Sequence, residues 1–185
     1  MLFDQQSKLA HDVLRNFAMF AAGDMSLKMF EQWVYTTPNI ADIVGYDQYV
    51  QLLDLEYRLP SAHEEAVSVV TQMVDQPFPD ELLREQVRLV LCGLINGTFN
   101  VFEACDKLAW WHHEGVLWIP IIFVGIESEL DSAPHPAQYN KWEPSALAAK
   151  LAEVEPWVSS YRNLAQAEAR QLLATKFPER LCEQE

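Results

Sequence analysis

The sequence predicts an all-α fold, a single-domain bundle of about seven or eight helices over residues 1–185. Three observations support this class. Apolar residues recur every three or four positions along most of the chain, which is the spacing of one helix face. Capping residues and helix-ending residues separate these periodic stretches. The hydrophobic fraction, 50% of 185 residues, is enough to form one sizeable core.

Apolar periodicity and capping signals place the helices of the first half. They are expected over residues 6–22, 26–37, 39–57 and 61–74. Ser26 is an N-cap candidate for the second helix, and Gly45 divides the third region into two short helices. Pairing of residues 48–57 as a short β element is the alternative there. Ser61, followed three residues later by Glu64, gives a capping-box pattern for the last helix.

The second half is predicted in the same way. Helices are expected over residues 80–96, 100–114, 120–130 and 143–177, with a loop over residues 131–142. Asn100 is an N-cap candidate with Glu103 in the capping position, and Pro120 suits the first turn of its helix. Pro156 predicts a kink or a break in the last helix.

The net charge of −14 excludes some classes of partner. A chain this acidic repels nucleic-acid phosphates and anionic lipid, and it attracts basic proteins by electrostatic steering. The charge is also uneven: between Lys28 and Arg84 stand ten acidic residues and a single base, Arg58. From Lys141 to the end, six bases nearly balance seven acids. This asymmetry argues against solubility as the sole reason for the acidity.

Cysteine usage and the absence of a leader pattern predict a cytoplasmic protein. Cys92, Cys105 and Cys182 are far apart and odd in number, so we expect reduced thiols, two of them in the core. The N-terminus lacks a basic region typical of signal peptides. The longest apolar run, residues 116–126, is too short to span a bilayer.

The stretch AWWHHEG, residues 109–115, raises the question of a metal site. His112 and His113 project about 100° apart on a helix, whereas ligands to one ion need a spacing of three or four. We therefore interpret both histidines as the end of a helix, with His112 hydrogen-bonded, and expect no metal. Trp110 is more unusual because the helical wheel places it on the acidic face. It packs under the C-terminal helices or belongs to a binding surface.

Two carboxylates, Glu127 and Asp131, stand four residues apart on an expected helix and would repel each other. They could serve a hydrolase or a divalent ion, but we favour an acidic surface for a partner or a polar helix end linked to Lys141. No nucleotide-binding, EF-hand or zinc motif is present, so the sequence predicts no cofactor and no catalytic residue.

Two stretches resemble known bacterial patterns. FEQWVYTTPNIADIVGYDQYVQLLDLEY, residues 30–57, resembles a segment of immunity proteins that accompany polymorphic or contact-dependent inhibition toxins. FVGIESELDSAP and WEPSALAAK, within residues 123–150, resemble a pattern of uncharacterised bacterial proteins. The resemblance implies a cytosolic, antitoxin-like protein and supplies no catalytic residues.

The leading hypothesis is a non-enzymatic immunity protein that binds a basic toxin domain, for example a nuclease, through an acidic-aromatic surface. The expected contact residues are Tyr35, Asp42, Tyr46, Asp47, Asp54, Glu56, Trp110, Glu127, Glu129 and Asp131. The first alternative is a small helical metal-dependent hydrolase that uses the three carboxylates of residues 127–131 with His112 or His113. A second alternative is a regulatory helical adaptor.

Overall fold

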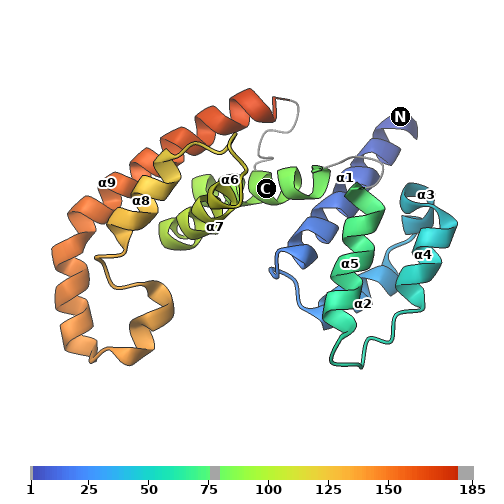
Figure 1. Ribbon diagram of the computed structural model, residues 1–185, viewed down its shortest axis with the longest axis horizontal. Helices are drawn as coiled ribbons and strands as arrows, with labels where there is room; N and C mark the ends of the chain where they lie inside the picture. The colour runs from blue at the N-terminus through green and yellow to red at the C-terminus, as the bar shows by residue number, and fades with distance from the viewer. Residues whose placement is uncertain (1, 76–79, 179–185) are drawn as a thin grey trace. The chain divides into compact units, whose positions relative to one another are not determined.

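A computed structural model describes residues 2–75 and 80–178, and the side chains of residues 10–74 and 80–178. The described residues form nine α-helices and one 3-10 helix without any strand, which confirms the all-α class. The chain divides into two compact units, Met1–Gln86 and Val87–Glu185 (Figure 1). The single-domain assignment stays a prediction. No helix in the described part of the chain is both long and apolar enough to cross a membrane.

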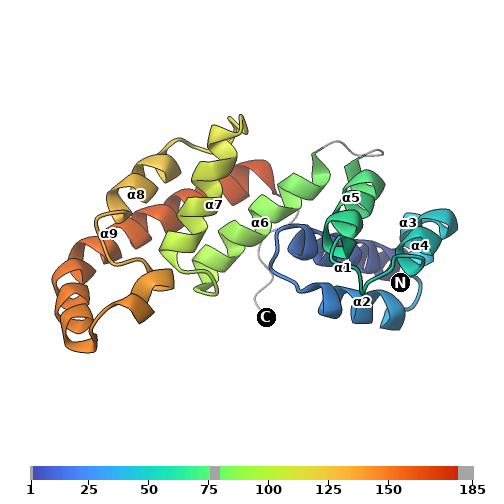
Figure 2. The ribbon, with the colours of Figure 1, turned by 60° about the horizontal axis from the view of Figure 1, so that its bottom comes forward.

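The first unit contains five helices and the beginning of a sixth. They are α1 (Leu2–Ala21), α2 (Leu27–Thr36), α3 (Ile40–Val44), α4 (Tyr46–Leu53), α5 (Ala62–Asp75) and the start of α6 (Glu81–Asn96). Helix α1 packs against α2, α3 and α5, and α4 packs against α2 and α5 (Figure 2). The side chain of Ser26 accepts a hydrogen bond from the Met29 amide, which confirms the predicted N-cap.

The predicted division at Gly45 is confirmed, because this residue has a φ of 90° between α3 and α4. The alternative of a short β element over residues 48–57 is wrong: most of this stretch lies in α4 and the rest in turns. A helix satisfies its own backbone hydrogen bonds, whereas a strand needs a neighbour, and the described residues supply none. The helix also buries Leu52 completely.

An aromatic cluster from α1 and α2 forms the centre of the first unit. The rings of Phe20 and Phe30 are stacked, with centroids 3.9 Å apart and an interplanar angle of 10°. The rings of Phe17 and Trp33 form a T-shaped contact with centroids 5.6 Å apart. His63 of α5 adds a T-shaped contact with Phe20. These contacts fix α2 against α1 and so position the helices that follow it.

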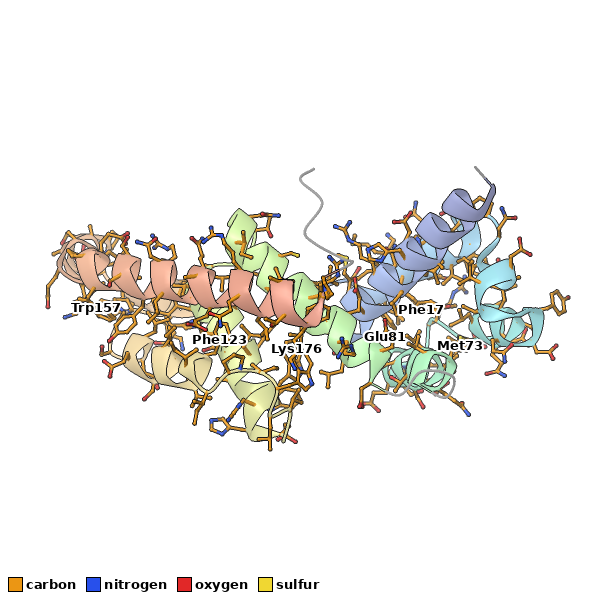
Figure 3. The ribbon with its side chains drawn as sticks, turned by 90° about the horizontal axis from the view of Figure 1, so that it is seen from above. Phe17, Met73, Glu81, Phe123, Trp157 and Lys176 are labelled. Carbon is orange, nitrogen blue, oxygen red and sulfur yellow. The ribbon has the colours of Figure 1, made fainter. Side chains whose placement is uncertain are left out.

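The second unit contains the rest of α6, followed by α7 (Val101–His113), α8 (Ile122–Leu130), η1 (Pro136–Lys141) and α9 (Pro144–Lys176). Helices α7 and α8 pack together, and both pack against α9, where Phe123 of α8 is fully buried (Figure 3). The Asn100 side chain accepts a hydrogen bond of 2.9 Å from the Glu103 amide, as predicted. The beginning of α7 is therefore set by its own sequence.

Two predictions for the second unit need correction. Residues 131–142 are not all loop, because the 3-10 helix η1 lies within them. Of the two alternatives at Pro156, the break is wrong, because α9 runs 33 residues through it, whereas a kink is consistent with the bent course of α9 in Figure 1. Proline removes one N–H and frees the carbonyl of Ala152. Both residues are exposed, so water can hydrate that carbonyl and the helix continues.

The described cysteines of the second unit lie in its core. Cys105 is a buried free thiol, and burial, followed by the charges of Asp106 and Glu127, raises its pKa to about 12. Cys92 is also buried, so the expected core placement holds for both residues. The expectation of a reduced thiol holds at Cys105. Cys182 lies outside the described residues.

Candidate functional site

The structure divides the ten predicted contact residues between the two units. Six lie in the first unit, namely Tyr35, Asp42, Tyr46, Asp47, Asp54 and Glu56, and four lie in the second, namely Trp110, Glu127, Glu129 and Asp131. Nine of the ten are exposed, and Glu127 is partly exposed. The six residues of the first unit are called the α2–α4 surface below.

Gly45 creates one end of the α2–α4 surface. Its positive φ turns the chain between α3 and α4, so that Asp42 lies in the first turn of α3 and Asp47 in the first turn of α4. Carboxylates are favoured there by the partial positive charge of a helix N-terminus. Tyr46 stands between them in sequence and is 73% exposed. A large aromatic side chain is thus left in solvent beside two acids.

Hydrogen bonds from tyrosine hydroxyls form the other end of this surface. Tyr35 donates to the carbonyl of Leu53 at 3.4 Å, immediately before Asp54, and its ring lies 6.3 Å from that of Tyr57. Tyr57 in turn donates to the carbonyl of Leu52 at 2.8 Å. These bonds hold α2 against the end of α4. Tyr35 is therefore held in place by its own unit.

Tyr49 and Tyr57 support the α2–α4 surface, although we did not predict them as site residues. Tyr49 donates to the carbonyl of Val34 at 3.4 Å. Burial, then the nearby Tyr35 and Glu31, raise the pKa of Tyr57, so its hydroxyl keeps its proton and remains a donor. No sequence pattern identifies the Tyr49 bond, since only the packing of α2 on α4 brings Tyr49 and Val34 together.

The second unit carries another acidic-aromatic surface, on α7 and α8. Trp110, which is 59% exposed, lies one helical turn from both Asp106 and His113. Both of these residues act electrostatically on Glu127 of α8, as does Asp131 at the end of that helix. The α7–α8 surface is defined by these five residues. The structure thus confirms that Trp110 is not packed under the C-terminal helices.

Asp106 is a member of this surface that sequence reasoning missed. Its carboxylate lies 3.3 Å from Nε2 of His135, whose ring meets the edge of Phe102. This pair joins the segment before η1 to α7. Glu129 lies on the exposed side of α8 and is not among the charged groups that shift the pKa of Glu127. The sequence could not identify Asp106, because its partner His135 is 29 residues away and only the tertiary structure brings the two together.

His112 of AWWHHEG is hydrogen-bonded, as predicted, whereas His113 is exposed. Nδ1 of His112 lies 2.8 Å from the carbonyl oxygen of Ile119, which ties the end of α7 to the turn before α8. The centroids of the His112 and His113 rings are 6.2 Å apart. In the described part of the chain, no group of three His, Cys, Asp or Glu side chains could hold a metal ion. The hydrolase alternative stays a hypothesis.

We expect Glu127 to make stability depend on pH. Burial, then Asp131 and Asp106, raise the pKa of Glu127 above its ordinary value, while His113 acts in the opposite direction. The folded state therefore binds the carboxyl proton of Glu127 more tightly than the unfolded chain does. The free energy of unfolding falls as the pH rises from the ordinary carboxyl pKa through the raised pKa of the folded state. Glu127→Gln should give a small increase in Tm at pH 7 that disappears below the ordinary carboxyl pKa. Thermal melts across pH measure this change, with Glu129→Gln as the control. The same pH dependence of Tm in both variants would contradict the prediction.

No family model, curated protein or solved structure matches the chain.

Proposed function

We propose that this protein is an immunity protein that binds and neutralises a basic toxin domain through the α2–α4 surface. The observation that carries the proposal is the exposure of Tyr46 and Tyr35 among carboxylates. Tyrosine is enriched among the residues that dominate binding energy at protein interfaces, and Tyr46 stands 73% exposed beside Asp47. The likeness of residues 30–57 to immunity proteins supports the same function.

Inhibition would be steric and electrostatic. The carboxylates of Asp42, Asp47, Asp54 and Glu56 would occupy the positions that substrate phosphates take in a basic cleft. Their charge would also accelerate encounter, because opposite potentials steer association. The two tyrosines would then fill apolar pockets at the rim of that cleft. No residue of this chain would need to perform chemistry.

Charge reversal at Asp47 and Asp54 is the experiment that tests this proposal. Asp47→Lys/Asp54→Lys should slow association with the cognate toxin by about tenfold or more at low salt and weaken its salt dependence. Stopped-flow kinetics across ionic strength would measure both quantities. Glu64→Lys/Glu65→Lys makes the same change in charge on exposed residues at the start of α5. Equal rates for the two double variants would exclude the α2–α4 surface.

A further inference from the structure

We propose that the α7–α8 surface recognises an arginine side chain of a protein partner, with the guanidinium stacked on Trp110 and paired with the carboxylates beside it. This inference takes from the proposed function only the existence of a protein partner. It concerns a different surface, and arginine recognition is argued from the residues of that surface. The α7–α8 surface is therefore a second contact, on the second unit.

The position of Trp110 on α7 supports stacking. Buried residues occupy the opposite side of this helix, including Cys105, Leu108 and Ala109, so the indole cannot reach the core. It stands near the centre of the exposed face, with Asp106 four residues before it and Glu114 four residues after it. A planar guanidinium can lie on an exposed indole and donate to carboxylates at the edge of the ring.

The charges around the indole select a cation. Glu127 and Asp131 bring two more carboxylates to the side on which Asp106 and His113 lie. Burial is the first cause of the raised pKa of Glu127, and the like charges of Asp131 and Asp106 add to it, so these carboxylates lie close enough to repel one another. A guanidinium would relieve that repulsion, and its forked donors can serve two carboxylates at once.

Lys107 lies three residues before Trp110 on α7, and its side chain contacts an aromatic ring near the start of the helix. Its ammonium lies over the ring of Phe99, 4.9 Å from the centroid, and so toward the turn that precedes α7. Two apolar side chains, Leu117 and Ile121, stand exposed in the connection from α7 to α8. The connection begins within one turn of Trp110. A peptide with an arginine next to an aliphatic residue would match this surface. Its guanidinium would meet Trp110, and its aliphatic side chain would meet Leu117 or Ile121.

A titration with small probes tests the assignment. The probe is N-acetyl-leucyl-arginine amide, with the lysine and citrulline analogues as matched ligands, followed in ¹H–¹⁵N spectra of the full chain at physiological salt. The arginine probe should move the Trp110 indole signal, identified by its loss in Trp110→Phe, and the amide signals of Glu127 and Asp131. The lysine analogue should bind more weakly, and the neutral citrulline analogue should leave these signals in place.

Variants of exposed residues separate stacking from general attraction to an acidic protein. Trp110→Ala should weaken binding of the arginine probe about two- to fivefold, which is the contribution of an exposed cation–π contact. Trp142→Ala removes another exposed tryptophan of the same unit and should change nothing. Glu127→Gln/Asp131→Asn should weaken binding similarly. Glu153→Gln/Glu155→Gln is its charge-matched control, since these acids pair with Lys150 and Arg162 instead.

The proposal is overturned if the arginine probe leaves the Trp110 signal unmoved, if either analogue binds equally well, or if Trp110→Ala binds like Trp142→Ala. Its failure is distinguishable from failure of the proposed function. Toxin binding that depends on Asp47 and Asp54 while the probe does not bind would leave only the α2–α4 surface. Trp110-dependent probe binding without any toxin neutralisation would leave arginine recognition and remove the immunity function.

Discussion

Replacing Phe30 with alanine is expected to lower the free energy of unfolding by about 3–5 kcal/mol, the range for large aromatic truncations in a core. Phe30 is fully buried in α2, and its ring contacts three aromatic side chains. They are Phe20, stacked at 3.9 Å, and Phe17 and Trp33, with centroids 6.2 and 5.8 Å away. Rings fixed on two helices cannot easily collapse into the space, so a cavity would remain.

Met29→Ala is the matched control, because Met29 is the preceding residue of the same helix and is 60% exposed. It should change stability by no more than about 0.5 kcal/mol. Urea unfolding followed by far-UV circular dichroism measures both variants. A Phe30→Ala loss as small as that of Met29→Ala would contradict the aromatic centre of the first unit. Coincident shifts in the signals of both units would also show that they unfold as one domain.

The second large effect is expected at Gly93 in α6, although an alanine there would ordinarily favour a helix by about 1 kcal/mol. A Cβ at Gly93 would lie 2.2 Å from Cδ2 of Phe99 and 3.0 Å from Oγ1 of Thr98. The Phe99 amide also donates to the Gly93 carbonyl at 3.1 Å, so the turn cannot simply move away. We expect Gly93→Ala to destabilise the protein by about 1–3 kcal/mol through overpacking.

Gly125 in α8 gives the opposite expectation and serves as the control. A Cβ there meets nothing within 4 Å, and the residue lies on the exposed side of its helix. Gly125→Ala should therefore stabilise the protein by about 0.5–1 kcal/mol, both from helix propensity and from a less flexible unfolded chain. Thermal and urea unfolding of the two variants measure the difference. A stabilising Gly93→Ala would show that Phe99 does not close on α6.

Local signals located most of the helices in advance. Ser26 and Asn100 cap their helices as predicted, and Gly45 separates α3 from α4. These features depend on a few neighbouring residues, which is why sequence alone reveals them. At Pro156 the sequence could not distinguish a kink from a break, because the cost of the proline depends on whether the freed carbonyl is hydrated. That depends on exposure, which only the packing of α9 sets.

The candidate contacts were predictable as residue types and not as surfaces. Composition singled out the acids and aromatics of residues 31–57, and the helical wheel singled out Trp110. Periodicity alone could not say that Tyr35 would be tied to the end of α4, or that Asp106 would lie near Glu127. Each of these relations joins residues from different helices, so it follows from how the helices pack.

By itself, the sequence determined the helical class, most of the helix ends and the acidic character of the protein, because these follow from spacing, local hydrogen bonds and composition. Only the tertiary structure decided which acidic residues of α7 and α8 lie close together and that Gly93 must remain without a side chain. The physical reason is that charge pairing, burial and steric contact depend on distance in space. The α7–α8 surface exists because two helices pack side by side, and neither helix contains it alone.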